Sequence, residues 1–321
     1  MLIAMSTTTN ARRGMYTATI RRNERLCDEH YQLELLIADF PPSTPGQFIE
    51  LHTQPAPVAS GHPILDWAAK DRFPQPHGPE FISATPLLRR PYSIAGHDVN
   101  HGTSVIRIIY RVIGKMTQKM EALRIDDEIS VLGPLGNGFS ISDGTSRVIL
   151  VGGGVGIPPM LYLGRELAQS RIPAMALIGV QKNTLLPLKL TNAGPSNLPV
   201  PLLCVEEFAQ FGISSIITTD DGSLGVRGRV TSALDAVLSQ LAGPGVVVCC
   251  CGPSRMMQAT AEVSEAYNVP CYASLEQPMA CGMGTCQSCI IKFKPPGSAE
   301  WVYKLTCSDG PVFNTRDIIW K

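Results

Sequence analysis

The 321-residue sequence predicts three units in succession: an antiparallel β-barrel, a doubly wound α/β domain with a parallel sheet, and a small cysteine-rich C-terminal module. Three observations predict this fold class. Short β-rich runs broken by Gly, Pro and Asp come first, strands and helices alternate after Arg147, and four cysteines gather near the C-terminus. We place the units at residues 15–144, 145–270 and 271–321, and expect residues 1–14 to be a disordered lead-in.

The composition is that of an ordinary globular protein and narrows the classes of partner. Lys+Arg and Asp+Glu both number 27, and this balance excludes nucleic acid and anionic membrane surfaces as expected partners. The chain has no apolar run of about 18 residues and no positively charged start before an apolar segment, so we expect a cytoplasmic protein. Ten cysteines in such a protein are expected to be thiols or metal ligands.

The first unit contains β-rich runs at the spacing typical of a small antiparallel barrel. Between them, residues 54–88 are rich in Pro, Gly and His and lack periodicity, which predicts an inserted loop. The expected strands are Tyr16–Arg22, Tyr31–Ala38, Phe48–Thr53, Val105–Val112 and Glu128–Leu132.

The second unit alternates apolar runs of strand length with amphipathic runs of helix length, which predicts a parallel doubly wound sheet. Expected strands are Val148–Val151, Ala174–Val180, Leu202–Val205 and Val246–Cys250, and expected helices are Pro158–Gln169, Val230–Leu241 and Ser254–Tyr267.

The third unit carries the most specific motif. Cys281, Cys286 and Cys289 have C-x4-C-x2-C spacing and Cys307 follows, as in a [2Fe-2S] site, and the intervening glycines allow a tightly turned loop. A structural zinc site remains the alternative, although such sites pair two C-x2-C knuckles or include His, and only Cys286 and Cys289 form a knuckle here. A disulfide framework is disfavoured in a chain of this length without a secretory signal. The module is too small to be stable without a metal centre or its neighbours.

A glycine-rich turn follows the first strand of the second unit and opens a helix. Gly152, Gly153, Gly154 and Gly156 would let backbone N–H groups and the helix N-terminus face a pyrophosphate. The turn departs from G-x-G-x-x-G, and no acidic residue follows the next strand, which disfavours the standard dinucleotide fold. A turn needed only for strand-to-helix packing is the alternative.

Several motifs, taken in order, resemble the ferredoxin-NADP reductase superfamily and, more closely, the electron-transfer subunits of NAD-dependent dihydroorotate dehydrogenase. The resemblance runs from Tyr16 to the C-terminus, omitting residues 54–88, and implies a Greek-key FAD barrel, an NAD domain and a [2Fe-2S] module. The motifs are Arg90-Pro-Tyr-Ser93, Tyr110-Arg-Val-Ile-Gly114, Gly133-Pro-Leu-Gly-Asn-Gly-Phe139, Gly152 to Pro159, Cys251-Gly-Pro253, the cysteine cluster and Asp309-Gly-Pro-Val-Phe313.

The resemblance implies which residues hold FAD. Arg90 would bind the FAD phosphates, Tyr92 would lie against the flavin or ribityl chain, and Ser93 would lie near flavin N5 in a catalytic position, chemistry that suits a guanidinium and an aromatic face. An exposed strand arginine is the alternative for Arg90. Met116 stands where the resemblance leads us to expect glycine, so the local path must differ there. The flavin-binding residues expected besides these are Pro91, Ile109, Tyr110, Arg111, Gly114, Met116 and Thr117.

The resemblance also implies an NAD site. Cys251, Gly252 and Pro253 would lie beside the nicotinamide, with Cys251 near the hydride path, while Cys249 and Cys250 pack in a buried strand. Asp220 or its neighbour would meet a ribose hydroxyl, although an Asp- and Gly-rich loop is also simply a turn. The sequence shows no arginine cluster for a 2′-phosphate, which favours NADH over NADPH.

The sequence shows no general acid/base pair and no Ser/His/Asp set, as expected of a chain that handles only electrons. By resemblance, the organic substrate belongs to an FMN-containing dihydroorotate dehydrogenase subunit, two copies of each chain forming a heterotetramer in pyrimidine (UMP) biosynthesis. Electrons would pass between NAD(H), FAD and the cluster. The alternatives are an oxygenase reductase ending in a ferredoxin domain, a flavin and iron–sulfur subunit of another NAD(P)H:ferredoxin or sulfide-type complex, and a non-catalytic zinc-stapled nucleotide-binding module.

Overall fold

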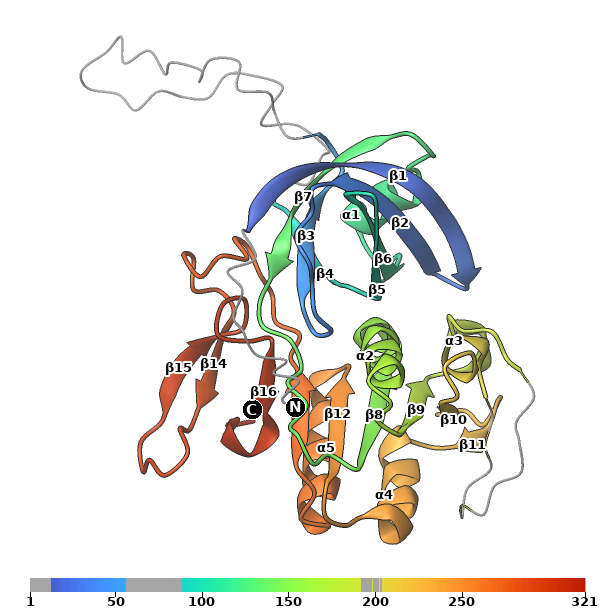
Figure 1. Cartoon of the computed structure of the whole chain (residues 1–321), viewed down its shortest axis with the longest axis vertical. Coiled ribbons are helices and arrows are strands. Elements are labelled where there is room, and N and C mark those ends of the chain that lie inside the picture. Colours follow the sequence, from blue (N-terminus) through green and yellow to red (C-terminus); the bar gives the residue numbers. More distant parts are fainter. Residues whose placement is uncertain (1–12, 56–87, 192–197, 199–201, 203, 321) are drawn as a thin grey trace.

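The structure is a computed structural model, which describes residues 13–55, 88–191, 198, 202 and 204–320. Figure 1 shows the barrel at one end of the molecule, the parallel sheet with its helices at the other, and the C-terminal hairpin beside that sheet. The lead-in predicted at 1–14 lies outside the described residues except at its end, where Gly14 begins strand β1. The inserted loop predicted at 54–88 lies almost entirely outside them as well.

The first unit is a seven-stranded antiparallel sheet that curls around one apolar core. Its order is β4-β3-β7-β1-β2-β6-β5, so strands distant in sequence become neighbours, as expected of a Greek-key arrangement. The elements are β1 (Gly14–Cys27), β2 (His30–Ala38), β3 (Phe48–His52), β4 (Arg90–Ser93), β5 (Gly96–Asn100), β6 (Thr103–Arg111), the short helix α1 (Lys115–Glu121) and β7 (Glu128–Leu135).

The second unit is a sheet of order β11-β10-β9-β8-β12-β13-β16, in which all pairs are parallel except β13 with β16. Helices α4 and α5 cover one face, and α2 and α3 lie on the other side, with α2 against the barrel (Figure 1). The strands are β8 (Arg147–Gly153), β9 (Ala174–Val180), β10 (Ser214–Thr219), β11 (Val226–Arg227), β12 (Val246–Cys251) and β13 (Cys271–Ser274); the helices are α2 (Ile157–Gln169), α3 (Glu206–Ala209), α4 (Val230–Leu241) and α5 (Ser254–Ala266).

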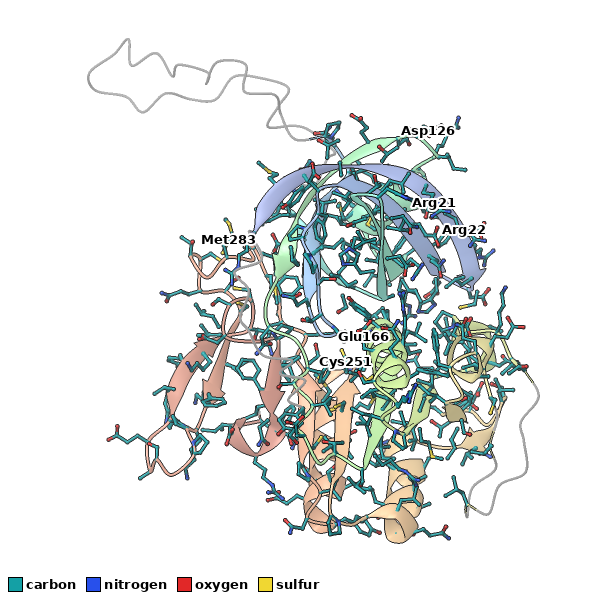
Figure 2. The ribbon with its side chains drawn as sticks, viewed as in Figure 1. Arg21, Arg22, Asp126, Glu166, Cys251 and Met283 are labelled. Atoms are coloured by element: carbon teal, nitrogen blue, oxygen red, sulfur yellow. The ribbon has the colours of Figure 1, made fainter. Side chains whose placement is uncertain are left out.

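The strand order reverses beside β8, because β9 lies on one side of it and β12 on the other. In open parallel sheets such a switch point leaves a crevice beyond the carboxyl ends of the strands, where ligands bind. Both the glycine-rich turn after β8 and the Cys251-Gly252-Pro253 string after β12 lie at this edge. Figure 2 shows Cys251 close to the centre of the molecule, near the barrel.

The C-terminal module consists of a loop, a hairpin and a returning strand. The hairpin pairs β14 (Ile290–Phe293) with β15 (Val302–Leu305), and β16 (Val312–Asn314) then pairs with β13 at the edge of the large sheet. Residues 271–274, which we assigned to the module, therefore form a strand of the α/β sheet, and the cysteine segment is inserted between two hydrogen-bonded neighbours.

One predicted strand is wrong. Around Leu202–Val205 the described residues form no strand, and Val205 makes only an isolated bridge with Leu190. The place beside β9 is taken by β10, whose buried Ser215, Thr218 and Thr219 weakened its apolar pattern. Within the described residues, no helix has the length and apolar character needed to cross a membrane.

Candidate functional site

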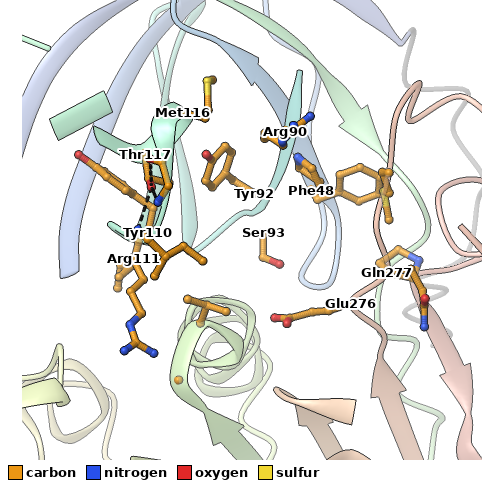
Figure 3. Close-up of a pocket in the computed structure, with 18 of the residues that line it drawn as sticks. Phe48, Arg90, Tyr92, Ser93, Tyr110, Arg111, Met116, Thr117, Glu276 and Gln277 are labelled. Atoms are coloured by element: carbon orange, nitrogen blue, oxygen red, sulfur yellow. Dashed lines mark hydrogen bonds between the residues drawn. The ribbon is translucent and has the colours of Figure 1, made fainter. Parts of the chain in front are cut away.

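The main cavity lies where the barrel, the β8–α2 turn and the segment after β13 meet (Figure 3). Its volume is about 880 Å³, within the range of cofactor sites. All ten residues that we predicted for flavin binding line it, although they come from three separated elements. They are Arg90, Pro91, Tyr92 and Ser93 of β4, Ile109, Tyr110 and Arg111 of β6, and Gly114, Met116 and Thr117 at the start of α1.

Two tyrosines form an aromatic wall of the cavity. The rings of Tyr92 and Tyr110 meet edge to face with centroids 6.5 Å apart, and Tyr31 stacks behind Tyr110 at 5.7 Å. The hydroxyl of Tyr110 donates to Asn23 at 3.0 Å, which fixes its ring. Burial raises the pKa of both Tyr92 and Tyr110, so their hydroxyls stay neutral. Tyr110 is 1% exposed, so Tyr92 is the ring that a flat conjugated ligand would meet, with Tyr110 packed against it.

Arg90 is a cationic group of the cavity that is suited to bind an anion. Its side chain is exposed, and its guanidinium donates to the carbonyls of Leu88 and Arg89. Among the described residues, no carboxylate lies within ion-pair distance of Arg90. Its charge is therefore available to a phosphate, whereas Arg111 on the same cavity is already paired with Glu29 at 2.8 Å.

The turn that precedes α1 is held by a side chain. The hydroxyl of Thr117 accepts from the N–H groups of Ile113 and Gly114 at 3.0 and 3.1 Å (Figure 3). Met116 lies in the first turn of the helix, is 6% exposed and packs in the barrel core, and it is not among the residues with positive φ. The position has an ordinary helical conformation, so methionine is accommodated without glycine's backbone freedom.

The four glycines at the end of β8 and in the turn that follows it have two different roles. Gly154 has φ of +53° and open space where a Cβ would stand, and of the four glycines it alone lines the cavity. A Cβ on Gly156 would stand 2.2 Å from the carbonyl of Cys251, and one on Gly153 would stand 2.4 Å from the sulfur of Met256. With Gly152, which is buried against Ile157, these glycines permit close packing, and only Gly154 presents backbone to a ligand.

Of the motif Cys251-Gly252-Pro253 at the end of β12, only the last residue lines the cavity. Pro253 lines it, whereas Cys251 is fully buried and Gly252 adopts φ of +156° behind it. Burial raises the pKa of Cys251 well above its usual range, so the group at this position is a neutral thiol. Cys249 and Cys250 are fully buried, as predicted. Cys251 therefore lies next to the cavity but is covered by the residues that line it.

Asp220 lies farther along the same edge of the sheet. It follows β10, and its N–H donates to the carbonyl of Val180 at the end of β9. The neighbouring Asp221 closes a turn by accepting from the N–H of Ser223 at 2.9 Å. Neither aspartate lines the main cavity, and two strands, β9 and β8, lie between β10 and β12 in the sheet.

The four cysteines form two neighbouring pairs of thiols, Cys281 with Cys286 and Cys289 with Cys307. Backbone N–H groups reach their sulfurs at 3.4 Å: those of Met283 and Cys286 to Cys281, and that of Cys307 to Cys289. Cys286 is exposed, and hydrogen bonds from Ser288 lower its pKa to about 6. Within the described part of the chain, no three His, Cys, Asp or Glu side chains converge closely enough to hold a single ion.

This donor set fits a dinuclear cluster better than one zinc ion. A [2Fe-2S] cluster takes four thiolates and spreads them over two metals, which two separate sulfur pairs match, whereas structural zinc draws four ligands to one centre. N–H groups aimed at sulfur are the contacts that tune such clusters. Cys289 and Cys307 pack with Phe48 and Leu135 of the barrel, so one side of the cluster would be shielded by apolar side chains.

Two acidic residues near these sites were missed by sequence reasoning. Glu276 follows β13 and projects into the cavity opposite Ser93 (Figure 3), where the surrounding protein raises its pKa to about 7. Glu50 of β3 has no exposed surface, and neither carboxylate oxygen has a hydrogen-bond partner among the described residues. A Cβ on Gly282 of the cysteine loop would stand 2.6 Å from the Glu50 carboxyl carbon. Glu50 lies within a strand and Glu276 lies two residues after one, and the apolar pattern alone marked neither.

Comparison with known proteins identifies the family. The electron transfer subunit of dihydroorotate dehydrogenase B (NAD(+)) from Geobacillus kaustophilus is 39% identical over 239 residues, 74% of this chain and 82% of that protein. This chain belongs to the family of dihydroorotate dehydrogenase B electron transfer subunits. The member of the family from Caldanaerobacter subterraneus is 33% identical over 260 residues, 80% of this chain and 91% of its own length. A family model described as the iron-sulfur cluster binding domain of dihydroorotate dehydrogenase B matches residues 276–319.

Solved structures support the fold predicted for this family member. A structure of an NADH-dependent reduced ferredoxin-NADP oxidoreductase, described for flavin-based electron bifurcation, aligns with a TM-score of 0.68 and 23% identity over 94% of this chain and 90% of that one. The ferredoxin reductase of carbazole 1,9a-dioxygenase aligns with a TM-score of 0.58 over 80% of this chain and 67% of that one, at 15% identity. The predicted resemblance to the ferredoxin-NADP reductase superfamily is confirmed at the level of the fold.

Proposed function

We propose that this chain transfers electrons between NAD(H) and an FMN-containing dihydroorotate dehydrogenase catalytic subunit, by way of bound FAD and a [2Fe-2S] cluster, in pyrimidine synthesis. The observation that carries the proposal is that the predicted flavin site and the cysteine loop adjoin each other. One cavity contains every predicted flavin-binding residue, and its lining continues through Gln277 and Met279 towards the ligand Cys281. FAD would connect two-electron transfer at the nicotinamide with one-electron transfer at the cluster.

The residues of the cavity divide the binding of FAD among them. Tyr92, with Tyr110 packed against it, offers an aromatic surface to the isoalloxazine, and the unpaired charge of Arg90 suits the FAD phosphates. Ser93 is the last residue of β4 and lies opposite Glu276 in the cavity, where the flavin would bind. The geometry is that of a preformed site, because hydrogen bonds within the protein hold the Tyr110 ring and the Thr117 turn.

The nicotinamide would enter from the switch point of the parallel sheet. Gly154, with backbone exposed to the cavity, suits the pyrophosphate, and Pro253 marks the approach to the flavin. Asp220 at the end of β10 is the candidate for a ribose hydroxyl farther out. The buried neutral thiol of Cys251 would support the nicotinamide pocket from behind. NADH is favoured, because a 2′-phosphate would need cationic partners that the sequence does not cluster.

The partner and location follow from the family. Curated relatives are named as subunits of a dihydroorotate dehydrogenase, which supports a catalytic partner and an assembly of two copies of each chain. Ten unpaired cysteines support a reducing compartment, the cytoplasm.

The test is spectroscopic and then enzymatic. The purified chain is expected to show flavin bands and broad iron–sulfur absorption, and both should bleach when NADH is added without oxygen. With the catalytic subunit present, dihydroorotate should drive NAD reduction, and neither chain alone should do so. A colourless protein that contains zinc, or dihydroorotate oxidation by this chain alone, would contradict the proposal.

A further inference from the structure

Helix α2 connects the barrel and the α/β domain. One face of it packs on the parallel sheet, and the opposite face lies against β5 and the chain segment that follows β2 (Figure 1). The face towards the barrel carries Tyr162 and Arg165, which are three residues apart and therefore neighbours on the helix surface. Both side chains cross from the α/β domain to the barrel.

Tyr162 inserts into the barrel. It is 3% exposed and packs with the barrel core, although it belongs to α2, and its hydroxyl donates to the carbonyl of Ser43 at 2.7 Å. The N–H of Ser43 donates to His97 Nδ1, which makes that nitrogen an acceptor, so His97 Nε2 donates to Ser104 at 2.9 Å. A chain of hydrogen bonds thus leads from the helix into the buried side of β5 and β6.

Arg165 is held by an ion pair next to that chain of hydrogen bonds. Asp98 of β5 accepts from Arg165 at 2.6 Å and from Arg107 of β6 at 2.7 Å. All three side chains are about three-quarters buried, and Arg107 lies over Gly96, where a Cβ would stand 2.9 Å from its guanidinium. Partial burial opposes the charge on Asp98, but the two guanidinium groups outweigh it and lower its pKa. The carboxylate therefore remains ionised between the two domains.

The same helix carries the glycine-rich turn at its other end. Residues 154–156 lead directly into α2, and Gly154 and Val155 line the main cavity opposite the flavin-binding strands. Tyr162 is seven residues beyond Val155, about 10 Å along a helix that rises 1.5 Å per residue. A tilt of α2 at Tyr162 and Arg165 would therefore move the turn relative to the aromatic wall.

We propose that Tyr162, Asp98 and Arg165 are positioning residues that fix α2 on the barrel and so set the approach of the nicotinamide to the flavin. The proposal rests on the proposed function. Hydride transfer requires the reacting atoms to lie about 3–3.5 Å apart, and a displacement of roughly 1 Å costs on the order of 100-fold in rate. No contact of these three side chains reaches the cavity, so they act only through the helix.

The test compares hydride transfer in Tyr162→Phe, Asp98→Asn and Arg165→Met proteins that contain both cofactors. Reduction of the flavin by NADH is followed by anaerobic stopped flow. The measurement is repeated with NADH deuterated at the transferred position, which gives the kinetic isotope effect. We expect each change to slow reduction about tenfold or more, with a larger isotope effect, and to change the affinity for NADH much less. Arg165→Lys, which keeps the cation, should recover part of the rate.

Two control substitutions each remove a polar contact of a similar kind that lies inside a single domain and not between the two domains. Glu24→Gln breaks an exposed ion pair with Arg22 inside the barrel, and Tyr267→Phe removes a hydroxyl contact with Asp235 inside the α/β domain. Both should leave flavin reduction and its isotope effect unchanged. Transfer from chemically reduced flavin to the cluster should also be unchanged in all variants, because α2 lies outside that route.

The outcomes separate the two proposals. If the unmodified chain binds flavin but NADH does not reduce it, the proposed function fails and the role of the helix fails with it. If NADH reduces the flavin of the unmodified chain and of the three variants at the same rate and with the same isotope effect, only the positioning role is overturned. The second result would hold even if the variants melt at lower temperature, since that would show a purely structural contact.

Discussion

At the scale of single residues, the two acids that the apolar pattern did not mark are the most informative side chains. Glu276 reaches the solvent in the cavity, while Glu50 is sealed between β3 and the cysteine loop, yet protein surroundings raise the pKa of both to about 7. A carboxyl that titrates near neutral pH beside a redox centre changes the local charge within the working range.

Glu276→Gln should remove a pH dependence of flavin reduction. As pH rises through about 7, Glu276 becomes negatively charged and opposes the arrival of negative charge on the flavin, so the rate with NADH should fall in the unmodified protein. The glutamine variant should keep the rate found at low pH across this range. Stopped-flow measurement from pH 6 to 8 decides the matter, and equal slopes in both proteins would count against this role.

Gly282→Ala should destabilise the cysteine loop by more than backbone strain alone. Gly282 has φ of +62°, and its Cβ would also meet the Glu50 carboxyl group at 2.6 Å. Gly297 provides the control, because it has φ of +76° with no atom near its Cβ position. Gly297→Ala should cost about 1–2 kcal/mol of unfolding free energy, and Gly282→Ala more, with recovery when Glu50→Ala is added. Equal costs, measured by denaturant unfolding, would rule out the contact.

At the scale of elements, the structure explains two glycine- and proline-rich motifs that the sequence could only match by resemblance. Asn137, in the segment after β7, donates from its side chain to the carbonyls of Asp309 and Val312 and accepts from the N–H of Val312. The motif that ends the barrel thus fastens the motif that follows the last cysteine. The cluster module is held against the barrel by directional contacts as well as by apolar packing.

Asn137→Ala should loosen the C-terminal module. It removes three hydrogen bonds, each with a net worth of about 1 kcal/mol, so we expect a loss of about 2–4 kcal/mol and faster release of iron to a chelator. Gln258→Ala, which removes one exposed contact with Glu262 on α5, is the comparison. Iron release followed by absorbance should be unchanged in the comparison; an equal rate in both variants would show that Asn137 does not hold the module.

At the scale of the whole molecule, the interface between the barrel and the α/β domain contains a histidine that burial keeps neutral. Burial lowers the pKa of His97 to about 4, against about 6.5 for an exposed histidine. Below about 6.5 the unfolded chain binds a proton that the folded chain does not, so stability is lost as pH falls from there towards 4.

The expected acid loss attributable to His97 is about 3 kcal/mol between pH 6.5 and 4. His97→Asn keeps a donor and an acceptor for Ser43 and Ser104 but cannot be protonated, so its unfolding free energy should depend less steeply on pH in this window. Urea unfolding of both proteins at several pH values measures this. If the unfolding free energies of the two proteins depend on pH in the same way, groups other than His97 cause the loss of stability in acid.

Much of the architecture was readable from the sequence, because period and motif spacing are local signals. The helix at Ile157–Gln169 and the strand at Ala174–Val180 stand where the pattern placed them. The strand Ser214–Thr219 was not found because buried Ser and Thr obscured it, and β13 was missed because the nearby cysteines dominated the interpretation. Tyr162, Glu50 and Glu276 gain their surroundings from distant segments, which no local pattern records.

The return of β16 to the edge of the large sheet has a consequence for assembly of the metal centre. The cysteine segment runs from Ser274 of β13 to Val312 of β16, which pair with each other, so folding of the sheet closes the loop that carries the four cysteines. Closing that loop is the entropic part of building a cluster site, and here it is completed by hydrogen bonds between strands. We therefore expect iron and sulfide to enter a chain whose nucleotide domain is already folded, so that a cluster could be rebuilt in the iron-free protein without denaturant.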